Sequence, residues 1–156
     1  SGEGRGRPCW RGRWCHGLAE ALRAARGKLE ATLFRGGYVQ DKFSADKSAF
    51  FTNEAVLDVP EGLKVEKPVG GFKVLEGSKA SAGRSLTFRE DNAKAAYIEA
   101  DLSFYLLPAL HLSASEMVLR PGARRRHAQV QTFGEGVGHF HRQKALLERD
   151  AALNEL

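Results

Sequence analysis

Three side chains in the middle of the chain are of types used in acid–base chemistry. Glu99 and Asp101 are two residues apart, so in a β-strand both carboxylates would lie on one face. Such a pair can share a substrate or a cation, and with His111 it would form the active site of a small enzyme. No known catalytic spacing joins the three residues, and the chain has no G-x-S-x-G motif. We therefore predict a charged surface facing solvent, no enzymatic activity and no cofactor.

A second candidate is the pair His139 and His141, which are separated by one residue. In an extended segment both imidazoles would point to the same side, where they could bind a metal ion. Metal-binding barrels of the cupin family carry a similar H-x-H motif, followed by a glutamate a few residues later and by a second motif downstream. Glu148 is too distant to match, and few residues follow it. We predict no metal site and interpret the pair as exposed loop histidines that precede a helix.

The densest charge cluster consists of three consecutive arginines, Arg124, Arg125 and Arg126. Arginine suits bidentate phosphate recognition, so the cluster could hold nucleic acid. Tyr97 and Tyr105 would then stack on bases from the polar face of a neighbouring strand. The carboxylates on that same face would repel phosphate. An RNA- or single-stranded-DNA-binding module is therefore our alternative hypothesis, and contact with a protein partner is the preferred role of the cluster.

Cations and aromatic residues alternate in residues 1–16, which we expect to form an extended arm. This mixture suits a groove on a protein, RNA or an anionic membrane surface. We predict Trp10, Trp14 and Leu18 as contact residues. Cys9 and Cys15 are spaced too widely for a usual zinc motif, so no structural metal is expected there.

Positive charge is concentrated at the two ends of the chain. Residues 1–47 hold ten Lys and Arg against five Asp and Glu, and residues 119–156 hold seven against four, whereas residues 48–118 hold seven against ten. An arginine-rich, acid-poor head is typical of a targeting segment, so we predict a mitochondrial or plastid location. No transmembrane segment is predicted, because the longest apolar stretch, residues 102–112, is short and interrupted.

Helices are predicted at both ends of the chain. In residues 17–35, apolar side chains recur at helical spacing on one stripe, namely Leu18, Leu22, Ala25, Leu29 and Leu33. Residues 134–156 are interpreted as a glycine hinge and a short C-terminal helix.

Residues 38–133 have the two-residue period of β-strands. The clearest strand runs from Ala96 to Leu106, with apolar side chains on one face and polar ones on the other. Turns are predicted at residues 60–62, 91–92 and 120–123. The short spacings leave no room for crossover helices, so we expect an α+β fold. It would consist mainly of an antiparallel sheet or small barrel of six to eight strands, with apolar side chains inside and no internal repeat.

These observations favour a non-catalytic structural or accessory subunit of a larger, organellar protein assembly. The central domain carries no catalytic motif, while both ends are basic and amphipathic. Such ends can dock on other protein subunits through charge and buried apolar area.

Overall fold

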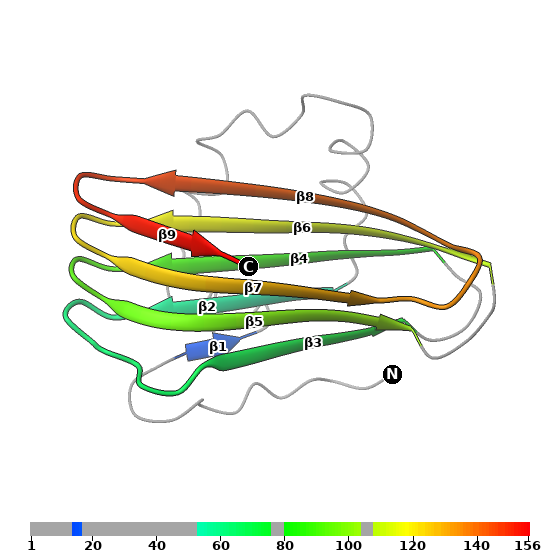
Figure 1. The fold of residues 1–156 in the computed structure, drawn as a ribbon, viewed down its shortest axis with the longest axis horizontal. Helices are drawn as coiled ribbons and strands as arrows, with labels where there is room; N and C mark the ends of the chain where they lie inside the picture. The colour runs from blue at the N-terminus through cyan, green and yellow to red at the C-terminus, as the bar shows by residue number, and fades with distance from the viewer. Residues whose placement is uncertain (1–13, 17–52, 76–79, 104–107) are drawn as a thin grey trace.

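The computed structural model describes residues 14–16, 53–75, 80–103 and 108–156, and all the regular structure in these ranges is β-strand (Figure 1). The strands are β1 (Trp14–His16), β2 (Asn53–Val59), β3 (Val69–Leu75), β4 (Ala80–Arg89), β5 (Lys94–Ser103), β6 (Ala109–Leu119), β7 (Arg124–Thr132), β8 (Val137–Leu147) and β9 (Ala152–Glu155). In the described part of the chain there is no helix with the length and apolar character needed to cross a bilayer.

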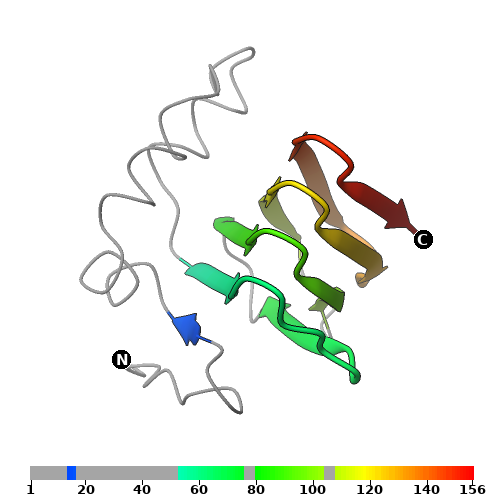
Figure 2. The ribbon, with the colours of Figure 1, turned by 90° about the vertical axis from the view of Figure 1, so that its left-hand side faces the viewer.

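Two sheets lie face to face, and the chain alternates between them. One sheet has the order β1-β2-β4-β6-β8 and the other has the order β3-β5-β7-β9. Every neighbouring pair from β2 to β9 is parallel, and only β1 runs antiparallel to its neighbour, β2. Figure 2 looks onto the connecting turns and shows the two layers of strands. The chain therefore winds as a two-sided β-solenoid.

Stacked turns set the length of each coil. The third residue of each turn has a positive φ: Gly62 (68°), Asn92 (58°), Gly122 (68°) and Asp150 (59°). Backbone hydrogen bonds join successive turns, as where the Asn92 amide donates to the Pro121 carbonyl at 2.9 Å. These turn residues are 30, 30 and 28 positions apart, which is an internal repeat. The prediction that the chain has no repeat is wrong.

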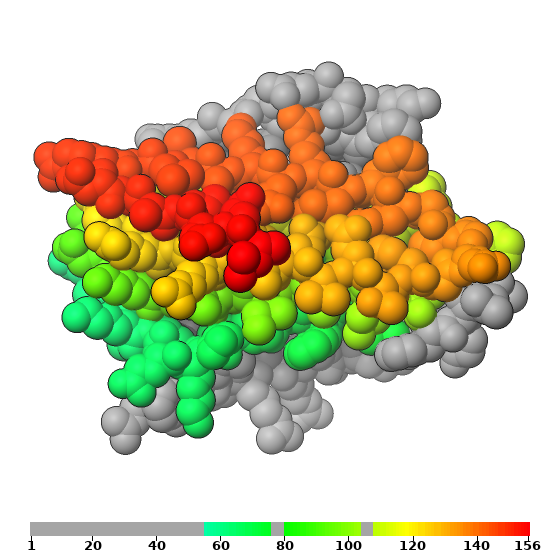
Figure 3. Space-filling view, viewed as in Figure 1, coloured from blue at the N-terminus to red at the C-terminus, as the bar shows by residue number. Residues whose placement is uncertain are grey.

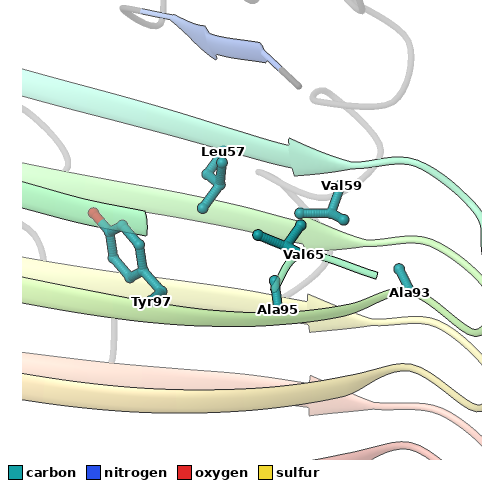
Figure 4. Packing of buried hydrophobic residues seen from close by; sticks show 6 residues of the cluster. All are labelled: Leu57, Val59, Val65, Ala93, Ala95 and Tyr97. Atoms are coloured by element: carbon teal, nitrogen blue, oxygen red, sulfur yellow. The ribbon is translucent and has the colours of Figure 1, made fainter. Parts of the chain in front are cut away.

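Apolar packing is concentrated at the turn end of the solenoid. One cluster consists of Leu57, Val59, Val65, Ala93, Ala95 and Tyr97 (Figure 4). A second cluster continues the stack with Met117, Leu119 and Ala123. These side chains hold the two sheets together beside the turns, so the other half of the interior is free to contain polar groups.

The predicted antiparallel α+β fold is wrong. Residues 137–147 and 152–155 form β8 and β9 in place of the expected C-terminal helix. Parallel neighbours need a helical crossover when they are consecutive strands of one sheet. Here each parallel neighbour comes one coil later, and the strand of the opposite sheet serves as the crossover, so no helix is needed. The helix predicted for residues 17–35 lies outside the described residues.

The predicted inside and outside of β5 are also reversed. Tyr97, Glu99 and Asp101 are buried between the sheets, whereas Ile98 is exposed on the outer face. The alternation of side chains was correctly recognised, but the polar face is the inner one. The expectation that Glu99 and Asp101 form a solvent-facing surface is therefore wrong.

Candidate functional site

Polar and charged side chains fill the half of the interior that lies away from the turns and also occur beside the apolar cluster, where Thr87, Arg89 and Arg125 are paired with Leu57, Val59 and Ala95. The buried members of this polar interior are Ser85, Thr87, Glu99, Asp101, His111, Ser113, Ser115, Arg125 and His127. They come from β4, β5, β6 and β7, whose inward positions alternate with outward ones. Buried charges destabilise a fold unless they are paired, so the partners of each carboxylate decide what this interior can do.

Glu99 is fully buried and well supplied with partners. Lys73 Nζ donates to Oε1. The hydroxyls of Ser85 and Ser115 donate to Oε2 at 3.1 and 2.7 Å, and His127 Nε2 lies 3.7 Å from the same oxygen. Burial raises the pKa of Glu99, but His127 and Lys73 together outweigh it and hold this pKa well below the ordinary value. Glu99 is therefore an ionised structural anchor.

Asp101 is equally buried, but its carboxylate lacks the hydrogen bonds that Glu99 receives. Lys73 Nζ lies 3.7 Å from Oδ1, and the Nε2 atoms of His111 and His139 each lie 3.9 Å from Oδ2. Neither carboxylate oxygen accepts a hydrogen bond from a residue that the structure describes. Burial raises the pKa of Asp101; Lys73 opposes this rise and the Glu99 carboxylate adds to it.

The two histidines predicted to be exposed in a loop instead lie on β8 and face the interior. The His139 ring stacks on His111, with ring centroids 5.2 Å apart and an interplanar angle of 15°. Ser113 Oγ lies 2.8 Å from His139 Nε2 and 2.6 Å from His141 Nδ1. Burial lowers the pKa of His141 to about 4, so this imidazole is neutral at pH 7. One ligand atom from each of Asp101, His139 and His141 lies within 4.8 Å of the others.

The three arginines predicted as a partner-binding cluster do not share one face of β7. Arg125 is buried: Nη1 donates to Thr87 Oγ1, and the guanidinium lies over the Tyr97 ring, 5.2 Å from its centroid. Burial lowers the pKa of Arg125 to about 10. Arg124 and Arg126 are exposed on the opposite face of the strand. Only these two are placed to contact a partner.

The other predicted contact residues are only partly described by the structure. Trp14 begins β1, while Trp10 and Leu18 lie outside the described residues. Tyr97 is buried beneath Arg125 and cannot stack on bases, and Tyr105 lies outside the described ranges. The nucleic-acid hypothesis thus loses Tyr97, one of the two tyrosines on which it depended.

Residues 73–156 match the model of the SUF system FeS cluster assembly SufBD core domain. The chain belongs to the SufBD core family. It is also similar to the iron-sulfur cluster assembly protein SufB of Bacillus subtilis, with 24% identity over 115 residues. That similarity covers 72% of this chain and 25% of the Bacillus protein, so the chain spans about a quarter of the length of this relative.

The part that matches the SufBD core family contains the whole polar interior. It begins at Lys73, the cation beside both buried carboxylates, and it includes Asp101 and both histidines of β8. The sequence interpretation named each of these carboxylates and histidines as a candidate but did not bring them together. It missed Lys73, Ser113 and Ser115, whose types alone carry no functional signal.

Proposed function

We propose that this SufBD core domain is a non-catalytic accessory part of a protein complex that assembles iron–sulfur clusters. We further propose that it docks on another protein subunit through the outer face of the β3-β5-β7-β9 sheet. The observation that carries this proposal is the group of large apolar side chains on that face. Iron–sulfur assembly comes from the family match, and docking comes from the surface itself.

The apolar patch consists of four side chains on three neighbouring strands. They are Phe72 (72% exposed), Val74 (46%), Ile98 (37%) and Val130 (46%). The register pairs Phe72 with Ala100 and Ala100 with Val130, so these three side chains form one row across the sheet. Single exposed apolar residues are ordinary, but a contiguous group marks an interaction surface. Figure 3 shows this face of the molecule.

A basic row lies on the same sheet, nearer the turns. Lys64 pairs with Lys94, and Lys94 pairs with Arg124. All three side chains are exposed, and none forms an ion pair with another residue of the described ranges. Adjacent strands are about 4.8 Å apart, so these like charges repel one another. An acidic partner surface would relieve this repulsion and set the orientation of docking.

The partner that fits is therefore a protein subunit with acidic side chains beside an apolar surface. This assignment keeps Arg124 and Arg126 as predicted contact residues and removes Arg125. Location in a mitochondrion or plastid stays a prediction from the basic head.

Site-specific photo-crosslinking in native cells tests the docking surface. A benzoylphenylalanine placed at Phe72 should capture a partner, which mass spectrometry should identify as an iron–sulfur assembly protein. The same group placed at Leu146, which is exposed on the other sheet, is the matched control. The double variant Lys94→Glu/Arg124→Glu should reduce the crosslink from Phe72 at least tenfold, whereas Lys67→Glu should not.

Two outcomes would overturn the proposal. One is the absence of any specific crosslink from Phe72, together with elution of the native protein as a free monomer. The other is a crosslinked partner whose yield does not change when the basic row is reversed in charge.

A further inference from the structure

We propose that Asp101, His139 and His141 bind one divalent first-row transition-metal ion between the two sheets. The three residues come from β5 and β8 and meet across the interior. Their ligand atoms lie within 4.8 Å of one another. The site does not depend on the docking surface, which lies on the outer face of a single sheet.

The donor set determines the class of metal. Two imidazoles and one carboxylate suit borderline divalent ions such as Fe²⁺, Co²⁺ and Zn²⁺, whereas Mg²⁺ and Ca²⁺ prefer oxygen ligands alone. A set of two histidines and one carboxylate also leaves coordination positions open for a further ligand. Fe²⁺ belongs to this class, and its choice over the other ions is the one part of the inference that rests on the proposed function.

The ligand atoms must move closer together to hold one ion. In tetrahedral geometry, ligand atoms that each lie about 2.1 Å from a metal ion are about 3.4 Å apart. His139 Nε2 and Asp101 Oδ2 are 3.9 Å apart and would need to approach by about 0.5 Å. Ligand atoms as far apart as 4.8 Å would need to approach by about 1.4 Å, a distance that side-chain rotation can supply.

The Asp101 carboxylate is the strongest sign that a cation belongs here. Its side chain has no solvent exposure, and neither oxygen accepts a hydrogen bond from the described residues. Two buried carboxylates, Glu99 and Asp101, share one ammonium, that of Lys73, and in the described ranges no other Lys or Arg lies within 4.0 Å of either. Lys73 donates its hydrogen bond to Glu99, and the ionisable groups of the described ranges within 4.0 Å of Asp101 Oδ2 are the imidazoles of His111 and His139. A metal ion at Oδ2 would neutralise the remaining negative charge.

Surrounding side chains hold both imidazoles in orientations suited to metal binding. His139 Nδ1 lies 3.2 Å from Gln131 Oε1, an acceptor that keeps the proton on Nδ1. Nε2 is then an acceptor that lies 2.8 Å from Ser113 Oγ and 3.9 Å from Asp101 Oδ2, so a metal ion bound there would replace the hydrogen bond from Ser113. His141 Nδ1 lies 2.6 Å from Ser113 Oγ. The side-chain amide of Gln129 lies 3.1 Å from the same nitrogen. In the tautomer whose Nδ1 donates to the Ser113 hydroxyl, Nε2 is a buried nitrogen with a free lone pair and no hydrogen bond to a described residue.

The part of the site nearest to solvent is the β8 side. The His139 side chain retains 11% of its exposure and His141 is half-buried, whereas Asp101 is completely enclosed. Binding is therefore expected on mixing, without unfolding of the domain.

Cobalt titration of the full chain tests the site. Cys9 and Cys15 are replaced by serine so that thiolate ligands cannot contribute. Co²⁺ alone is added to metal-free protein, and the visible d–d absorption is followed together with calorimetry. We expect saturation at one equivalent, no thiolate-to-cobalt charge-transfer band, and a rise in melting temperature with added Co²⁺.

Single-residue variants locate the ion. His141→Ala, His139→Ala and Asp101→Asn should each weaken Co²⁺ binding by at least about 10- to 100-fold. His127→Gln is the matched control, because it removes another buried imidazole of the same interior that lies beside Glu99 and outside the proposed ligand set. It should bind Co²⁺ within about twofold of the parent. Circular dichroism establishes that each variant is folded before it is titrated.

Absence of saturable Co²⁺ binding by the parent protein would overturn the inference, even if every variant unfolded. So would stoichiometric binding that survives His141→Ala and Asp101→Asn in folded protein, since the ion would then lie elsewhere. These measurements use no partner, so their failure is distinct from a failure of the docking proposal.

Discussion

Replacing Lys73 with methionine should destabilise the fold strongly, because its ammonium balances carboxylates that have no solvent exposure. Lys73 contacts Glu99 Oε1 and lies 3.7 Å from Asp101 Oδ1. Removing one partner of a buried ion pair destabilises a protein by about 3–5 kcal/mol. Because 18% of the Lys73 side chain is exposed, water screens part of the interaction, and we expect about 3 kcal/mol. In a chain of this length, this loss corresponds to a melting temperature lower by about 6–12 °C.

A double-mutant cycle separates the ion pair from the packing of the lysine stem. Thermal unfolding is followed by circular dichroism for the wild type, Lys73→Met, Glu99→Gln and the double variant. The glutamine keeps an oxygen that accepts from the two serine hydroxyls but carries no charge. The double variant should therefore be more stable than the sum of the single effects by about 1–3 kcal/mol. Lys67→Met, at an exposed position, is the control and should change stability by no more than about 0.5 kcal/mol.

The pH dependence gives a second signature. The pKa of Glu99 lies well below its ordinary value of 4.5, so in the wild type this carboxylate contributes stability above that pH and the contribution is lost as the pH falls. Without Lys73, Glu99 takes up a proton at milder acidity. The stability difference between wild type and Lys73→Met should therefore shrink between pH 7 and pH 4. A variant that melts within about 2 °C of wild type at pH 7, or a cycle with additive effects, would refute the reasoning.

Three further predictions follow from the inner faces and the turns. A Cβ at Gly71 would overlap the hydroxyl of the tyrosine on β5, whereas one at Gly83 meets its nearest atom at 3.5 Å. In urea denaturation, Gly71→Ala should thus lose about 1–3 kcal/mol and Gly83→Ala should stay within about 1 kcal/mol of wild type. Burial lowers the pKa of His141 to about 4, so the unfolded chain binds a proton that the folded chain does not. Wild-type stability should fall by about 1–3 kcal/mol between pH 6.5 and pH 4 in denaturation series, and His141→Gln should flatten that fall. Gly122→Ala should lower the melting temperature more than Gly62→Ala: both residues have φ of 68°, but only at Gly122 would the new Cβ meet the side chain of the stacked asparagine.

The local elements of the central region were predictable from the sequence. Turns were expected at residues 60–62, 91–92 and 120–123, and backbone hydrogen bonds close turns at all three places. The two-residue period correctly identified β5 as a strand. Strand order was not predictable from this period, because alternation is the same in parallel and antiparallel sheets. The regular spacing of the turns was the missing signal, since it sets the coil length and therefore the register.

That register also explains why the candidate site was missed. With a coil of about thirty residues, His139 on β8 falls beside His111 on β6, and the two rings stack. Both then face Asp101 across the interior. The histidines and the carboxylate were each identified by type, but the distances that join them exist only when the two sheets face each other.

The reversal of the two faces of β5 connects both proposals. The rule that apolar side chains point inward holds when burial outweighs every other contribution. Here the buried positions hold Glu99 and Asp101, while Ile98, Phe72 and Val130 on the outer face remain exposed. This arrangement lowers the stability of the isolated domain in two ways. Inside, the Asp101 carboxylate has too few partners, and outside, apolar side chains are exposed to water. A ligand that binds only the folded state restores stability by mass action. A cation would match the buried carboxylate, and a protein partner would match the exposed apolar patch. Each of these ligands should raise the melting temperature independently of the other.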